Sequence, residues 1–582
     1  MNRLLSSLLT LTLGCLVAGC EPTTTTPRRK TSQTQATGSG GDVNLETALN
    51  YLERMSEFSP QQASIQSAYY FNQWLKTRPE KSSWSPDLLV ARLPRETRET
   101  KAMERLDEMQ FRLEDIEYLE GVRWCARISN WAKQRVNKRL RAWVDQQGDQ
   151  LTAEQKEQLL IAERMFDWTV RNIQLDEMPP PPKRNAVGPT STESQGEQAL
   201  SPPARAVIGP GYTLFPHEAL LYGHGDAHQR GRLFIRLCQQ QHIDAVMLAI
   251  DRGRGQTDQW IPAALIGGEL YLFDPQLGLP IPTPTGGVAT LSAARQDPAV
   301  LAQLSLEDLP YPVQSGDLKS VVVEIDANPQ QLSRRMAELE PRLTAGHQMR
   351  IMVEPTALAN RLRKLPGVSG VRIWSMAFDA LAYRSAIDRI EVERPELIPK
   401  ILQERALFYD LNPLVRGRRM HFDGAFNVTE PGKPTAKKLY MQIRVDKTSI
   451  EKLRTDESVQ RRLSLVRDDQ ESDAQWSRRI YSTELMLRFG KQHASFWMGL
   501  IHFENGDFGD AADWFEKRTI DAHMDGMWTN GARYNLARTY EAQGDISGAR
   551  QILLTDESPQ QQGNRVRAKL LRQWTTAEKP TG

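Results

Sequence analysis

The chain has 582 residues, of which 40% are hydrophobic and 25% are charged, as in ordinary globular proteins. A chain of this length is expected to form about three or four domains. The 74 basic and 72 acidic residues give a formal net charge of only +2, so there is no overall attraction to nucleic acid. Four cysteines are too few for a disulfide framework. No ligand motif indicates a cofactor, and we expect none.

The start of the chain has the pattern of a bacterial lipoprotein signal peptide, predicted over residues 1–19. A basic start, Met1-Asn2-Arg3, precedes an apolar run from Leu4 to Leu16, which is shorter than the ~20 apolar residues of a membrane span. Val17-Ala18-Gly19-Cys20 then resembles a lipobox, which implies cleavage before Cys20 and its acylation. Buried acyl chains would hold the mature protein on a membrane, exposed to the periplasm. The alternative is an ordinary cleaved signal with an incidental cysteine.

Three stretches of different composition follow the signal. Residues 20–44 contain few apolar side chains to offset the entropy of ordering, which predicts a flexible tether. Residues 45–178 carry apolar residues at three-four spacing, as in 111–119 and 159–168, which predicts helices. Residues 179–208 begin with four prolines and predict a linker.

Residues 209–306 predict a compact unit built around one helix and a set of strands. The helix is expected over 227–241 and a buried strand over 245–250. Two further strands, 260–265 and 269–273, are separated by Gly267-Gly268, which is typical of a hairpin turn.

This unit resembles the core of transglutaminase-like cysteine hydrolases. In that family a nucleophilic cysteine opens a helix, and here Ala227 stands at its position. The family's His-Ala-Trp and Asp-Pro motifs fall on Asp258-Gln259-Trp260 and Asp274-Pro275. The resemblance therefore implies a papain-like α+β fold that has lost its catalysis, because alanine cannot attack a substrate and Asp258 replaces the histidine.

The resemblance also implies a cleft, lined by Trp260 with Asp226 and His228 beside the helix start, that binds an extended peptide or glycan-peptide without cutting it. One alternative is acid/base hydrolysis shared by Asp258 and Asp274. Another is a peptidase or amidase with a displaced nucleophile, and a third is a structural assembly factor whose cleft is vestigial. The remaining thiols, Cys125 and Cys238, both fit better as buried packing residues.

Three histidines, His217, His224 and His228, are close in sequence. A spacing of four, as between His224 and His228, places two zinc ligands on one face of a helix. However, residues 223–226 read as a turn, so we expect loop or core histidines and no metal site.

Residues 318–394 predict a separate small α/β unit, with a ferredoxin-like arrangement as one possibility. Strands are expected at 320–325, 349–353 and 371–374, with helices at 330–343 and 356–365 between them. Residues 395–479 form a mixed region without a clear pattern.

Residues 480–575 contain an internal repeat that resembles tetratricopeptide repeats. Gly499, Gly506 and Ala511 recur as Ala537, Gly544 and Ala549, together with Tyr540, at an offset slightly longer than the family's usual 34 residues. The resemblance implies stacked helical hairpins with small residues at the helix contacts. Such hairpins either present a concave surface to a protein partner or pack on the preceding domain.

Together these features resemble lipoproteins of planctomycete-type bacteria that join the two modules. The fold class expected is multidomain α+β: a helical region, a transglutaminase-like domain, a small α/β unit and helical repeats. The function expected is non-catalytic binding of protein or peptide partners in the cell envelope.

Overall fold

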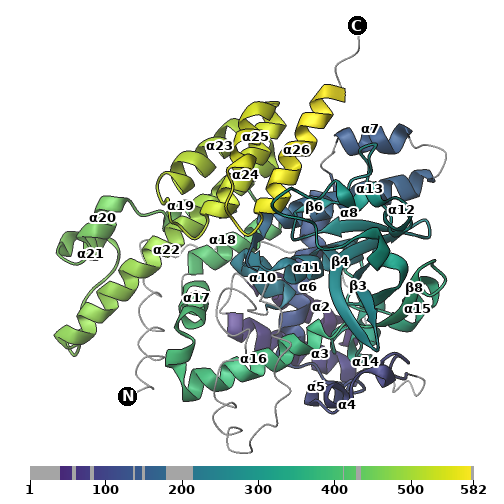
Figure 1. The fold of residues 1–582 in the computed structure, drawn as a ribbon. Coiled ribbons are helices and arrows are strands. Elements are labelled where there is room, and N and C mark those ends of the chain that lie inside the picture. Colours follow the sequence, from purple (N-terminus) through teal and green to yellow (C-terminus); the bar gives the residue numbers. More distant parts are fainter. Residues whose placement is uncertain are drawn as a thin grey trace, which may run out of the picture.

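The computed structural model describes residues 40–55, 60–78, 84–134, 138–146, 151–177, 214–410, 412–427 and 434–577 (Figure 1). The predicted signal peptide, Cys20 and the predicted linker lie outside these residues. The protein is a mixed helix-and-sheet structure with several distinct hydrophobic cores.

The N-terminal part is helical, as predicted for residues 45–178. Its helices are α2 (Gly40–Glu53), α3 (Pro60–Lys76), α4 (Arg95–Arg98), α5 (Lys101–Glu104), α6 (Leu113–Ala132), α7 (Lys138–Gln146) and α8 (Ala153–Asn172). The predicted tether is too long, because α2 already begins at Gly40. The apolar face of α2, which includes Leu45 and Leu52, packs into a core shared with α3 and α6.

The sheet has six strands in the order β6-β5-β4-β3-β7-β8. Its strands are β3 (Asp244–Gly253), β4 (Gln256–Ile266), β5 (Glu269–Asp274), β6 (Leu279–Pro280), β7 (Val321–Ile325) and β8 (Val368–Ile373). The first four form an antiparallel meander whose β4–β5 turn is the predicted Gly267-Gly268, both with positive φ. β7 pairs antiparallel with β3, and β8 pairs parallel with β7.

This topology corrects the prediction of a separate α/β unit at 318–394. Its first and third strands belong to the same sheet as β3, β4 and β5, and Val323 shares one core with Leu248 of β3. The predicted strand at 349–353 does not form. Instead the Glu340 carboxylate accepts the backbone N–H groups of Ile351 and Met352, so a side chain satisfies amides that a neighbouring strand would otherwise pair.

Helices cover both faces of the sheet. α8 and α11 (Ala227–Gln240) pack on one face, where they share a core with Met247 and Phe273. The other face is covered by α12 (Leu291–Gln296), α13 (Pro298–Ala302) and α15 (Pro355–Leu362). A short parallel pair, β1 (Gln174–Leu175) and β2 (His224–Gly225), ties the end of α8 to the start of α11.

The region predicted as mixed is helical in its described parts. It contains α17 (Pro399–Asp410), α18 (Asn412–Phe422), α19 (Ala436–Ile443), α20 (Lys447–Lys452) and α21 (Glu457–Arg462), and it follows α16 (Met376–Glu393). Figure 1 shows α20, α21 and the first half of α22 (Asp473–Asn505) extending away from the sheet.

The C-terminal helices pack consecutively on one another, as expected for helical hairpins. They are α22, α23 (Phe508–Phe515), α24 (Thr529–Gln543), α25 (Ile546–Leu554) and α26 (Gln561–Ala577). Gly506 and Gly544 end α22 and α24 in the left-handed conformation. The small residues predicted at helix contacts, Ala511, Ala537 and Ala549, are fully buried, and Tyr540 is half-buried. A π-helical turn over 516–520 lies between α23 and α24, where the offset exceeds the usual period.

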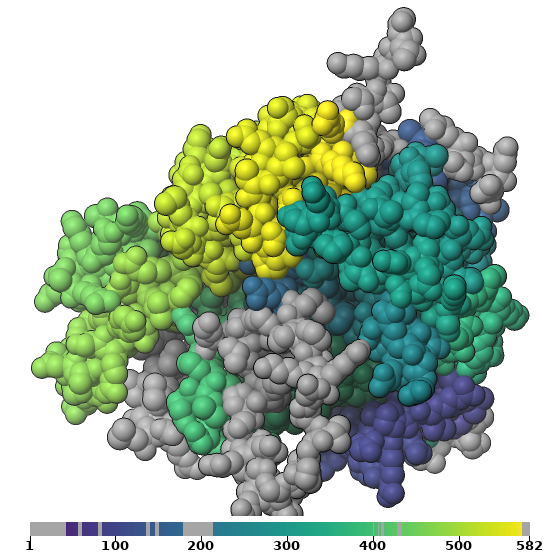
Figure 2. All heavy atoms as spheres, viewed as in Figure 1, coloured from purple at the N-terminus to yellow at the C-terminus, as the bar shows by residue number. Residues whose placement is uncertain are grey.

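One side of these hairpins is docked on the rest of the protein, which supports the packing alternative for that side. Arg171 of α8 forms a buried ion pair of 2.5 Å with Glu504 of α22 and another of 2.8 Å with Asp167. Arg538 of α24 pairs with Asp167 at 2.6 Å. In Figure 2 the C-terminal helices and the residues after β5 form one continuous surface.

Gly499 provides a test of this packing. A Cβ atom there would lie 2.5 Å from Cε1 of Phe515, whereas Gly509 has no atom within 4 Å of its Cβ position. We expect Gly499→Ala to lower the free energy of unfolding by roughly 1–3 kcal/mol through overpacking. Gly509→Ala should be neutral or stabilising, because alanine is the better helix former. Denaturant unfolding measures both, and equal effects would show that α22 and α23 are not in close contact.

Candidate functional site

The predicted nucleophile position lies at the first residue of α11. Asp226 is the N-cap: its side chain accepts from the backbone N–H of Gln229, and the Gln229 side chain accepts from the backbone N–H of Asp226. This capping box starts the helix at Ala227, which is buried. The first residue of this helix therefore carries a methyl group and no nucleophile.

Asp274 lies at the end of β5, and hydrogen bonds hold both of its carboxylate oxygens. Oδ1 accepts from the backbone N–H groups of Gln276 and Leu277, and Oδ2 accepts from the Tyr311 hydroxyl at 2.7 Å. That hydroxyl in turn accepts from Nε1 of Trp260 at 3.0 Å. Burial raises the pKa of Asp274, and these hydrogen bonds oppose the rise. Tyr311 was missed from the sequence because it lies outside both motifs.

Asp258 is in a different environment, at the exposed start of β4. Its carboxylate pairs with Arg252 at 2.8 Å, and Arg252 also pairs with Asp317. A bulge in β4 follows, where Met247 pairs with Pro262 but Ala249 pairs with Gln259. One carboxylate is exposed and the other buried and fully bonded, so this arrangement gives no support to shared acid/base chemistry by Asp258 and Asp274.

The residues predicted to line a cleft are mostly part of the core, which corrects that prediction. Trp260 is 9% exposed and Asp226 is 2% exposed. His228 is half-buried, with its ring edge-on to Trp374. Neither Trp260 nor Asp226 offers an open contact surface to a peptide.

The C-terminal segment packs against the Asp-Pro turn. Arg230, buried in α11, donates to the carbonyls of Ile173 and Pro275 and to Oε1 of Gln560. Burial lowers the pKa of Arg230 to about 10. At Gly563 a Cβ atom would lie 1.8 Å from the Leu277 carbonyl oxygen, so only glycine allows this approach. The segment that carries Gln560 and Gly563 thus fills the space beside the Asp274-Pro275 turn.

The three histidines have separate partners, and the predicted turn at 223–226 is wrong, because His224 and Gly225 form the short strand β2. His217 bonds to Glu117, His224 bonds to Asp176 and Glu404, and His228 lies against Trp374.

His224 is a buried imidazole held between two carboxylates. Nδ1 lies 2.7 Å from Asp176 and Nε2 lies 2.6 Å from Glu404. Burial alone would lower the pKa of His224, but the two carboxylates outweigh it and raise the pKa well above its usual value. The group is therefore a structural cation that links β2 to α17.

Both described thiols lie in surroundings that favour the neutral form. Cys125 and Cys238 are both buried. Burial raises the pKa of Cys125 to about 12 and that of Cys238 well above its usual value. Thiolate is the attacking species in cysteine chemistry, and burial disfavours it at both residues.

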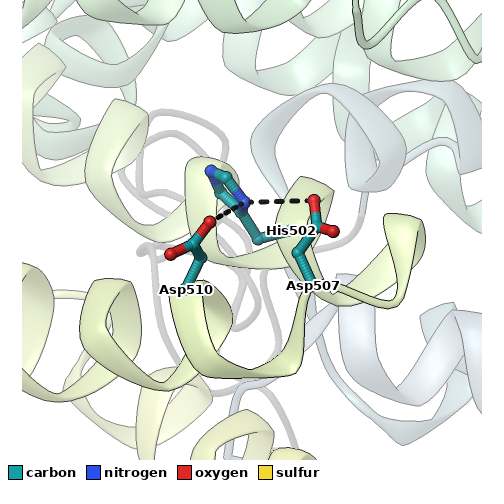
Figure 3. A group of neighbouring side chains, drawn as sticks. All are labelled: His502, Asp507 and Asp510. Atoms are coloured by element: carbon teal, nitrogen blue, oxygen red, sulfur yellow. Dashed lines mark ion pairs between the residues drawn. The ribbon is translucent and has the colours of Figure 1, made fainter.

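One group of possible metal ligands lies elsewhere, at the turn between α22 and α23. Figure 3 shows Nδ1 of His502 facing Asp507 and Asp510, at 3.5 Å from one oxygen of each. Burial and the nearby Lys437 lower the pKa of His502. Both carboxylates are well exposed to water, so the group has the character of a surface ion-pair cluster. Its residues span the end of α22, so no regular sequence spacing marks the group.

Comparison with protein-family models, curated proteins and solved structures found no match. Among the described residues, no helix has the length and apolar character that crossing a membrane requires.

The paired imidazole predicts a pH-dependent stability. The contribution of His224 is complete below its unfolded pKa of about 6.5 and is lost as pH rises through its raised folded pKa. The cost of His224→Gln should therefore be largest near pH 6 and shrink at higher pH, by up to about 1.4 kcal/mol per pH unit. Denaturant unfolding at a series of pH values measures this.

The Glu404→Gln variant is the matched control for this experiment. It removes one carboxylate, which lowers the pKa of His224 in the folded protein. The pH range over which His224 stabilises the folded protein should therefore become narrower. A cost of His224→Gln that is independent of pH would show that the imidazole is neutral in the folded protein.

Proposed function

We propose that this chain is a non-catalytic, lipid-anchored protein of the bacterial cell envelope that binds a protein or peptide partner. The observation that carries the proposal is the start of α11. Ala227, which the resemblance aligns with the cysteine of a transglutaminase-like enzyme, is the first residue of a well-capped helix, and Tyr311 and two backbone amides occupy the Asp274 carboxylate. A hydrolase of this type needs a thiolate beside an imidazole.

The proposal includes an assignment for two regions of the fold, the sheet with α11 and the C-terminal helices. A helix followed directly by the β3–β4–β5 meander, with Asp-Pro at the strand end, supports descent from a transglutaminase-like domain. The buried small residues and the glycine-capped turns of α22 to α25 support descent from tetratricopeptide repeats.

The competing enzyme hypothesis finds no support at the described thiols. A displaced-nucleophile peptidase or amidase needs a reactive thiol near Asp274, and both Cys125 and Cys238 are buried with raised pKa values. A binding role needs no such group.

The partner surface we propose is the outward side of the C-terminal helices. The opposite side is docked on α8 through Arg171 and Arg538, and Trp260 is in the core. Large apolar side chains of α19, α22, the α23–α24 connection and α25 are exposed to water. They are Met441, Tyr481, Met524, Met527 and Leu554. Exposed methionines suit adaptable protein contacts.

Site-specific photocrosslinking tests this surface. A crosslinker at Met524, which is 73% exposed, should give a discrete adduct in envelope fractions. The matched control is the same crosslinker at Val392 of α16, which is 80% exposed but lies outside the proposed surface. The proposal fails if neither position gives an adduct, or if both give the same products.

The anchor is tested separately. Cys20→Ser should move the protein from the membrane fraction to the soluble fraction, because acyl chains supply the membrane affinity in this account. Fractionation with and without detergent measures the change. A Cys20→Ser protein that still needs detergent for release would contradict the lipoprotein assignment.

A further inference from the structure

A polar pocket lies at the end of α11 opposite Ala227. It has a volume of about 290 Å³, near the lower end of the ~300–1,000 Å³ typical of small-molecule sites. Its walls come from α2, α6, the α11–β3 connection and the loop at 345–350. The floor includes the apolar side chains of Leu49, Leu52 and Met349.

The charge of this pocket is one-sided. Its lining includes Arg123, Arg127, Lys133 and Arg350 together with two histidines, and no lining residue is acidic. The side-chain amides of Asn130, Gln240, Gln241 and Gln348 add hydrogen-bonding groups. Convergent cations with few competing carboxylates favour an anionic ligand.

Carboxylates outside the lining neutralise part of this charge. Arg123 pairs with Asp423, Arg127 with Glu53, and Arg350 with Glu340. Lys133 donates to the amide oxygen of Gln241 at 3.0 Å and has no carboxylate partner within the described ranges. Of the four lining cations, Lys133 is therefore the one whose charge no carboxylate of the described residues balances.

Two further observations point to a ligand. The Nε atom of Arg123 is buried and has no hydrogen-bond partner among the described residues, although most buried polar groups have one. Two non-glycine residues with positive φ, His242 at 57° and Ala345 at 50°, line the pocket. Backbone held in such a conformation concentrates at ligand sites.

We propose that this pocket binds a small multivalent oxyanion, a compound carrying phosphate or several carboxylates on a short carbon skeleton. The guanidinium groups of Arg123, Arg127 and Arg350 supply donors in a geometry that suits both kinds of oxyanion. Lys133 supplies the unbalanced charge, and the apolar floor accepts the skeleton. The site is separate from the proposed partner surface and does not depend on it.

Thermal unfolding of the full mature chain tests the proposal with two probes, pyrophosphate and citrate, against sodium chloride at matched ionic strength. A bound ligand raises Tm saturably, whereas general screening does not. A rise with pyrophosphate alone identifies phosphate as the ligand chemistry, and a rise with citrate alone identifies carboxylate. The absence of a saturable rise with either probe overturns the proposal.

Variants locate the effect. Lys133→Gln/Arg350→Gln should raise the concentration of probe at half-effect by at least about tenfold, because it removes two of four cations. Arg461→Gln, which removes an exposed arginine of α21, is the control and should match the wild type. If the double variant does not fold, Lys133→Gln alone serves, since the hydrogen bond of this side chain among the described residues is to the Gln241 amide oxygen. A wild-type midpoint in these variants would place binding elsewhere.

Discussion

The arrangement of this protein depends on buried guanidinium groups that join segments far apart in the sequence. Arg171 links α8 to α22 through Glu504, and Arg230 links α11 to the Asp-Pro turn and to Gln560. A buried cation is costly unless its donors are satisfied, so the segments that satisfy it must stay in place. Asp167 extends the first link to Arg538 of α24. These ion pairs therefore hold the C-terminal helices against α8.

The packing of these segments determines which parts of the Asp274 region are open to a ligand. In the resemblance that the sequence suggests, the region beside Asp274 is an open catalytic cleft. In the structure, Trp260 and Tyr311 fill one side, and the segment carrying Gln560 and Gly563 packs on the turn itself. The space beside Asp274 therefore holds the segment that carries Gln560 and Gly563. In our proposal, a domain with alanine at position 227 needs no substrate access there.

Local patterns were predictable from the sequence. The helix expected at 227–241 is Ala227–Gln240, the turn expected at Gly267-Gly268 forms, and Gly506 and Gly544 end their helices. Each depends on residues within a few positions of one another. The joining of β7 to β3, the hydrogen bond from Tyr311 to Asp274, and the contacts of Arg230 were not predictable, because each depends on long-range pairing. The pocket at Lys133 was missed for the same reason.

The measurement that tests the account most directly is the stability of Glu504→Gln. Removing this carboxylate leaves Arg171, which is 2% exposed, without one of its two partners. The free energy of unfolding should fall by roughly 3–5 kcal/mol, and amide exchange should rise in both α8 and α24. Glu457→Gln, which breaks an exposed pair with Arg461, should cost no more than about 1 kcal/mol. Equal losses of unfolding free energy in the two variants would contradict the claim that the buried pair holds the C-terminal helices against α8. Faster amide exchange confined to α22 would contradict it as well.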